Sequence, residues 1–120
     1  MIDHVGFEVA DLARSAAFYD RLFFALGARR MFDSEHAIAY GVNGPELWIV
    51  SRGRQAAPGY GHIAIRASGK AAVDAGYRAG LAAGGADDGP PGPRPQYGRR
   101  YYAGYLLDPD GYRVELASRR

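Results

Sequence analysis

The chain has 120 residues, which is short enough for one compact domain and long enough to bury a core. Its net charge is only +2 and its arginines are scattered, so a nucleic-acid-binding stripe is not indicated, and no apolar run is long enough to span a membrane. The absence of cysteine excludes disulfides, thiolate metal sites and a cysteine nucleophile. The N-terminus lacks the layout of a signal peptide, so we expect a cytoplasmic protein that binds neither nucleic acid nor membranes.

The first part of the chain, about residues 1–52, predicts the order β-α-β-β-β. Residues 3–9 alternate between apolar and polar as a strand does, and Asp11 is placed to cap a helix over 12–26. Three further strands are predicted over 29–32, 36–42 and 46–51.

A linker of about residues 53–60 contains glycine and proline without periodicity. The second unit, about 61–120, predicts a strand, a helix over 69–83, and a closing hairpin around the turn Asp108-Pro109-Asp110-Gly111. Before the hairpin, residues 87–98 are rich in proline and glycine, which predicts a long loop with at most an edge segment.

The two units repeat one another. Gly61-His62-Ile63-Ala64 restates Asp3-His4-Val5-Gly6, with a histidine followed by aliphatic and small residues, 58 positions further along the chain. A repeat that keeps its spacing suggests one structural unit used twice. A histidine at the start of both copies predicts that the units meet around a site.

Three residues have the chemistry of a metal site: His4, His62 and Glu115. Strand alternation puts each of them on the face opposite the helices. Two imidazoles and one carboxylate form the facial set that leaves open positions on Fe(II), Mn(II) or Zn(II), where a substrate oxygen can be polarised. Alternation does not show that the three converge, and the alternative is two hydrogen-bonded strand histidines and a solvated glutamate.

The whole chain resembles the vicinal oxygen chelate superfamily, which includes glyoxalase I, bleomycin-resistance proteins, fosfomycin-resistance enzymes and extradiol dioxygenases. The resemblance rests on Asp3-His4-Val5, Phe18-Tyr19, Gly61-His62-Ile63-Ala64 and Leu107-Asp108-Pro109-Asp110-Gly111-Tyr112-Arg113-Val114-Glu115-Leu116. It implies an α+β fold of paired βαβββ units forming a half-barrel around a divalent metal (Zn, Ni, Mn or Fe). It also implies that His4, His62 and Glu115 are the metal ligands.

Further roles follow from the resemblance. Glu46 is similar to the additional first-unit ligand of glyoxalase I and is the candidate general base; the alternative is a residue that merely starts a strand. The resemblance also makes Tyr40, Trp48 and Tyr105 candidates for binding substrate. Strand alternation adds Tyr101, which shares a face with Tyr105. Arg66 is a candidate for holding an anionic substrate, and the alternative is an ordinary solvated charge. For the aromatic residues among them, the alternative is an ordinary place in the core.

Two functions stay open at this point. The first is a divalent-metal-dependent enzyme, similar to a lyase or isomerase, that acts on a small oxygen-rich molecule. The second is a non-catalytic protein that sequesters an antibiotic-like ligand in an aromatic groove. The resemblance also implies a homodimer, in which His4 of one chain joins His62 and Glu115 of the other, although the sequence leaves open whether the site lies within one chain.

Overall fold

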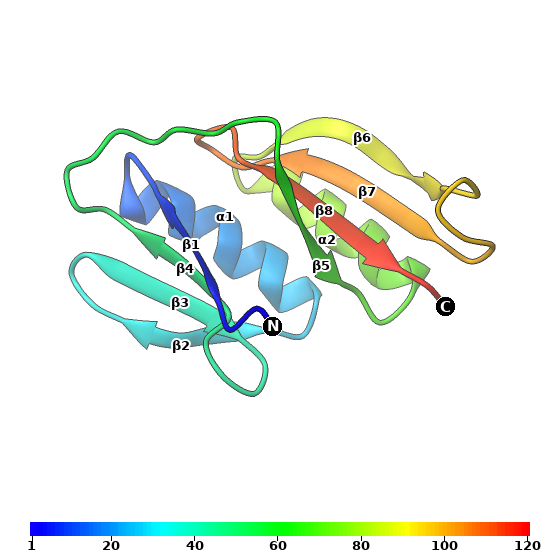
Figure 1. Ribbon diagram of the computed structural model, residues 1–120, viewed down its shortest axis with the longest axis horizontal. Coiled ribbons are helices and arrows are strands. Elements are labelled where there is room, and N and C mark those ends of the chain that lie inside the picture. Colours follow the sequence, from blue (N-terminus) through cyan, green and yellow to red (C-terminus); the bar gives the residue numbers. More distant parts are fainter.

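The computed structural model describes residues 1–120 and shows two βαβββ units (Figure 1). The first consists of β1 (Val5–Glu8), α1 (Leu12–Ala25), β2 (Arg29–Asp33), β3 (Ala37–Gly41) and β4 (Leu47–Val50). The second consists of β5 (His62–Arg66), α2 (Lys70–Ala82), β6 (Ala86–Pro93), β7 (Tyr102–Leu107) and β8 (Arg113–Ser118). The predicted α+β fold of paired units is confirmed.

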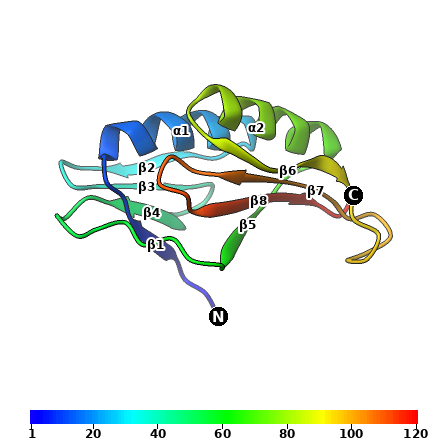
Figure 2. The same cartoon turned by 90° about the horizontal axis from the view of Figure 1, so that it is seen from above.

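The two sheets have the same topology. Their strand orders are β1-β4-β3-β2 and β5-β8-β7-β6, and in each the first strand runs parallel to its neighbour while the other pairs are antiparallel. Both helices lie on the same side of the sheets (Figure 2). Neither helix is long and apolar enough to cross a membrane.

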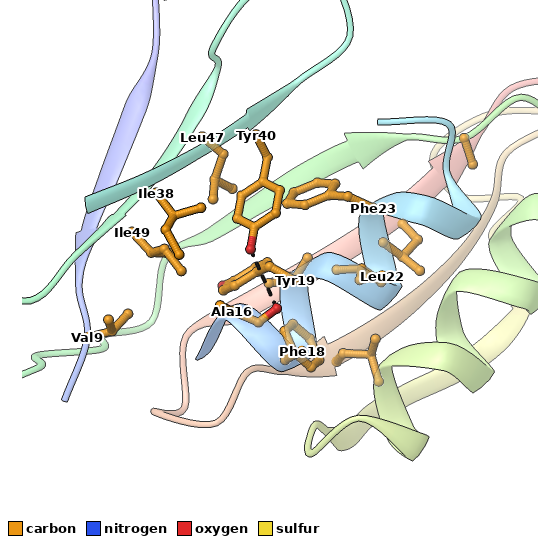
Figure 3. Packing of buried hydrophobic residues seen from close by; sticks show 14 of the residues in the cluster. Val9, Ala16, Phe18, Tyr19, Leu22, Phe23, Ile38, Tyr40, Leu47 and Ile49 are labelled. Carbon is orange, nitrogen blue, oxygen red and sulfur yellow. Dashed lines mark hydrogen bonds between the residues drawn. The ribbon is translucent and has the colours of Figure 1, made fainter. Parts of the chain in front are cut away.

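One core serves both units. It is a cluster of 15 buried residues that includes Phe18, Tyr19 and Leu22 of α1 together with Leu106 and Leu116 of the second sheet. Figure 3 shows Tyr19 and Phe23 of α1 beside Tyr40 of β3. The side chain of Asp11 accepts a hydrogen bond from the Arg14 amide and caps α1 as expected.

Helix α2 lies close against its sheet. A Cβ added at Gly76 would lie 2.9 Å from Cδ1 of Leu116, and one added at Gly80 would lie 2.5 Å from Cδ1 of Leu106. These distances leave no room for a methyl group. The glycines therefore permit a close approach that compensates for their poor helix propensity.

The proline-rich segment differs from the prediction. Residues Ala86–Pro93 form β6, an edge strand paired with β7, so the edge segment takes up most of the expected loop. Two register irregularities, between Asp87 and Gly89 and between Gly89 and Gly92, interrupt the pairing. Prolines are compatible with an edge strand because their missing N–H groups need only face away from the partner strand.

The turn Asp108-Pro109-Asp110-Gly111 joins the second unit to α1. Tyr19 donates its hydroxyl hydrogen to the buried Asp108 carboxylate at 2.7 Å. Arg14 forms an ion pair with Asp110 at 2.8 Å. We call these two contacts the clasp. This part of the motif that carries the resemblance therefore has a structural role in joining the two units.

Candidate functional site

The site residues lie on the sheet surfaces that face away from the two helices, here called the distal faces. Strand alternation sends Val5 and Phe7 of β1 toward the core and His4 and Gly6 to the distal face. The same rule places Trp48 of β4 on the distal face of the first unit. In the second unit it places His62 and Glu115 there.

His62 and Glu115 are in contact. Nε2 of His62 lies 3.0 Å from Oε1 of Glu115, across the neighbouring parallel strands β5 and β8. The Glu115 side chain is only 4% exposed, whereas half of the His62 side chain is exposed. The pair therefore presents a buried carboxylate and an accessible imidazole on one surface.

Two tyrosines of the β7 region surround this pair. Tyr101 donates its hydroxyl hydrogen to Oε2 of Glu115 at 2.5 Å, and this hydrogen bond raises the pKa of Tyr101 to about 12. The ring of Tyr105 meets the His62 ring edge to face at 6.3 Å, and burial raises the pKa of Tyr105. The hydroxyl of Tyr101 is therefore already engaged in a hydrogen bond with Glu115. Tyr101 orients this carboxylate, whereas the sequence interpretation has Tyr101 binding the substrate.

His4 is oriented by its neighbour. Nδ1 of His4 lies 2.7 Å from the carboxylate of Asp3, which leaves Nε2 free. A carboxylate bonded to one ring nitrogen is the usual support for a histidine that binds a metal through the other. His4 and His62 both border a cleft of about 1200 Å³ between β1 and β5.

The three expected ligands do not meet within one chain. No group of three or more His, Asp or Glu side chains gathers closely enough to hold a metal ion. The candidate ligands are thus divided between the two units, with His4 on the first and the pair His62 and Glu115 on the second.

Tyr40 differs from the expectation. It lies on the helix side of β3, facing α1 (Figure 3), and is 1% exposed. Its hydroxyl donates a hydrogen bond to Asp20 of α1 at 2.7 Å. Burial, with the hydrogen bond to Asp20, raises its pKa above the usual value for tyrosine. It packs against Phe23 with ring centroids 5.0 Å apart. Tyr40 therefore packs in the core, and it also borders the cleft that His4 and His62 line.

The profile of the Glyoxalase/Bleomycin resistance protein/Dioxygenase superfamily matches residues 1–116. The chain belongs to this superfamily. A crystal structure of a glyoxalase/bleomycin resistance protein from Albidiferax ferrireducens is similar at 31% identity, with a TM-score of 0.89 over 100% of this chain and 99% of that one. A glyoxalase-related enzyme from Fulvimarina pelagi is 27% identical, with a TM-score of 0.79 over 98% of this chain and 87% of that one.

More distant structures share the superfamily fold. The fosfomycin resistance protein FosX from Mesorhizobium loti is 24% identical, with a TM-score of 0.72 over 98% of this chain and 91% of that one. A comparison with curated protein sequences finds no match. Superfamily membership and fold are thus shown, while the reaction has to be argued from the site.

The superfamily fold implies a divalent metal, and the donors present fit one. Nitrogen and oxygen ligands lie about 2.0–2.2 Å from such an ion, so two ligands at a right angle lie about 3 Å apart. The spacing of 3.0 Å between Nε2 of His62 and Oε1 of Glu115 meets this requirement. An imidazole and a carboxylate suit Zn, Mn or Fe.

Strand register changes the interpretation of Glu46. Val5 lies opposite Leu47 in the first sheet and Ile63 lies opposite Val114 in the second, so the repeat maps Trp48 onto Glu115. Glu46 instead precedes β4 and is exposed, beside His4 at the start of the neighbouring strand. The first unit therefore has an indole where the second has its carboxylate ligand candidate.

Two other charged residues border these faces. Arg66 ends β5, is exposed, and forms no ion pair with a carboxylate.

Glu8 was missed by the sequence interpretation, although it shares the alternation of His4. Its carboxylate accepts a hydrogen bond from the Arg52 amide at 2.6 Å, which lowers the pKa of Glu8 and fastens the start of the linker to β1.

Proposed function

We propose that this protein is a divalent-metal-dependent enzyme, similar to a lyase or isomerase, that acts on a small oxygen-rich molecule. The observation that carries the proposal is the contact of His62 with Glu115 at a spacing suited to two ligands of one ion. The free Nε2 of His4 would complete a set of two histidines and one carboxylate.

The ligand set would be completed in a homodimer. Because His4 stands apart from His62 and Glu115 in one chain, we propose that the imidazole comes from a second copy of the chain. The metal would polarise a substrate oxygen and stabilise negative charge that develops on it.

Other residues would handle the substrate itself. Arg66 would attract an anionic group, because its guanidinium is exposed and has no carboxylate partner. Tyr105, whose pKa is raised by burial and whose ring lies against His62, would stay protonated and act as a hydrogen-bond donor. Glu46 is the candidate general base, since it is exposed at the level of His4.

The test is zinc binding measured by calorimetry on metal-stripped protein. We expect stoichiometric binding in the wild type and a loss of at least 100-fold in affinity in His62→Ala and in Glu115→Ala. His36→Ala is the matched control, because His36 is an exposed histidine outside the site. A wild type that binds no zinc, or a His62→Ala variant with unchanged affinity, would contradict the proposal.

The second candidate function is non-catalytic binding of a small aromatic molecule. It is favoured by the aromatic contact between Trp48 and Phe32 on the distal face, with ring centroids 5.2 Å apart. Tight ligand binding by metal-free protein, without turnover in metal-loaded protein, would support this function over catalysis.

A further inference from the structure

Strands β1 and β5 are free edges of the two sheets. Each pairs with one neighbour only, β1 with β4 and β5 with β8. The two edges face each other across the cleft of about 1200 Å³, in the middle of the molecule (Figure 1). They run in opposite directions, because Tyr112, which lies beside the start of β5, donates a hydrogen bond to the carbonyl of Glu8 at the end of β1.

Both edges present unpaired backbone groups to this cleft. The amides of Val5 and Val9 donate to the β4 side, and the amide of Ala67 donates to the β8 side. In a parallel pair, alternate residues bond the neighbouring strand, so the N–H and C=O groups of Gly6 and Ala64 point the other way, into the cleft. No third strand meets them there. Such an edge is a template for pairing with another strand.

The linker crosses one end of the cleft and limits its length. The hydroxyl of Tyr112 bonds the carbonyl of Glu8 at 2.7 Å and accepts a hydrogen bond from the amide of Ala57 at 3.1 Å. The ring of Tyr112 also stacks on Phe7, with centroids 4.7 Å apart. The walls are strands of 4 and 5 residues, so an extended occupant of similar length fits between them.

The floor of the cleft, on the helix side, is apolar. It is formed by Phe23 of α1, the adjacent Leu26 and Leu47 of β4. An alkyl chain lying here would remove water from the backbone groups of both edges without replacing their hydrogen bonds, which is unfavourable. An extended peptide matches both surfaces, because its amides pair with the edges and every second side chain points to the floor. The volume also exceeds the range of about 300–1,000 Å³ that is usual for small-molecule sites.

We propose that the cleft between β1 and β5 binds an extended peptide of about five residues as an additional strand, with apolar side chains at alternate positions. The peptide pairs with Gly6 on one side and with Ala64 on the other, and it joins the two sheets into one. Its apolar side chains lie beside Phe23 and Leu26. This site needs no metal and goes beyond the proposed function.

The probe is a fluorescein-labelled peptide, Leu-Thr-Leu-Thr-Leu with blocked ends, titrated into metal-stripped protein by fluorescence anisotropy. We expect it to bind at least 10-fold more tightly than Thr-Thr-Leu-Leu-Leu, which has the same composition without alternation. N-methylation of the central leucine, or of a threonine next to it, should each weaken binding at least 10-fold, because adjacent amides pair with opposite edges. Equal binding of the two peptides, or tolerance of either N-methyl group, would overturn the proposal.

Amide hydrogen exchange reports on the two edges directly. In the free protein, the amides of Gly6 and Ala64 should exchange faster than those of Phe7 and Ile65, which bond within the sheets. A saturating amount of the alternating peptide should slow the exchange of Gly6 and Ala64 at least 10-fold. Bound peptide without protection at these two amides would show that it binds elsewhere, and would contradict the proposal.

A variant pair tests the edge of β5. Ala64→Pro removes the N–H that faces the cleft and leaves the bonds to β8 in place, as proline at a sheet edge does. It should lose at least 10-fold in peptide affinity, whereas Ala64→Ser, which keeps the N–H, should bind like the wild type. Unchanged affinity in Ala64→Pro would overturn the proposal, and the N-methylated peptides test the same pairing on the wild type if this variant does not fold.

Zinc binding is measured separately. Peptide binding by a wild type that binds no zinc would overturn the proposed function alone. Zinc binding by a wild type that does not bind the alternating peptide would overturn this inference alone.

Discussion

Tyr101 and Tyr102 serve opposite sides of the same sheet although they are adjacent in the chain. Tyr101 donates to Glu115 on the distal face, and Tyr102 donates to Asp74 of α2 at 2.7 Å. Each tyrosine donates one hydrogen bond to a carboxylate, one on the distal face and the other on the helix face of the sheet. This gives a matched pair for testing what Tyr101 contributes to the candidate site.

We expect Tyr101→Phe to weaken zinc binding by about 10- to 100-fold, the usual effect of removing a group that orients a metal ligand. Oε2 of Glu115 would lose its donor, and the carboxylate would be less fixed toward His62. Tyr102→Phe should leave zinc affinity unchanged. Competition titration against a chelator measures the zinc affinity of both variants. Equal affinities would show that Tyr101 does not contribute to zinc binding.

Tyr40 allows a test of pH dependence in the core. Burial raises the pKa of Asp20, but hydrogen bonds from Arg30 and Tyr40 outweigh it, so the pKa lies below 3.8 in the folded protein. The stabilisation from the ionised carboxylate is present above pH 3.8 and is lost as the pH falls through the folded pKa.

Tyr40→Phe should therefore cost about 1 kcal/mol of unfolding free energy at neutral pH, a value reduced by the partial exposure of Asp20. The difference from wild type should shrink in acid, where Asp20 is protonated in both proteins. Urea unfolding at neutral pH and near pH 2 measures it. A penalty that stays constant between the two conditions would argue against the hydrogen bond to Asp20 as its cause.

At the scale of elements, the boundaries of the helices could be predicted from local signals. The predicted ranges 12–26 and 69–83 agree with Leu12–Ala25 and Lys70–Ala82 to within one residue at each end. Caps and periodicity act within a few residues, so the sequence carries them directly. Strand β6 could not be predicted in this way, because its formation depends on pairing with β7 and on being at the edge.

Helix α2 gives the prediction at this scale. Gly80→Ala should destabilise the protein by about 1–3 kcal/mol, although alanine favours an isolated helix by roughly 1 kcal/mol. The added Cβ would lie 2.5 Å from Leu106 and 3.2 Å from Phe18. Gly59→Ala is the control, since no atom lies within 4 Å of its added Cβ. The free energy of unfolding of each variant is measured by guanidinium denaturation. A midpoint for Gly80→Ala above that of the wild type would disprove the close packing of α2.

Register between strands limited what could be predicted of the site. Alternation correctly separates the two faces of each strand, but it does not say which residue of β3 lies opposite Trp48. Residues 42–46 between the strands fix that register, and they place Ala39 opposite Trp48 and Tyr40 opposite Leu47. The same turn places Trp48, and not Glu46, at the position in the first sheet that is equivalent to Glu115 in the second.

At the scale of the whole molecule, the separation of His4 from His62 and Glu115 predicts that an intact metal site would be shared between two chains. In a homodimer that shares its site, each ion would take His4 from one chain and His62 with Glu115 from the other. Ultracentrifugation should then give twice the chain mass of 13.0 kDa.

A mixed dimer of His4→Ala and Glu115→Ala chains tests the sharing directly. One of its two sites would have all three ligands, so it should bind half the zinc of the wild type, while either parent variant binds poorly. If the ligands instead come from one chain, the mixed dimer has no intact site. Its zinc content would then equal that of the parents.

The clasp has a consequence for how such dimers assemble. Tyr19 and Arg14 on α1 hold Asp108 and Asp110 of the second unit. Since both units are in one chain, these contacts form intramolecularly and do not weaken on dilution. Domain swapping between copies would require α1 to release both aspartates and to open the common core, which imposes a kinetic barrier on exchange. Dimers should therefore form by docking of chains that are already folded.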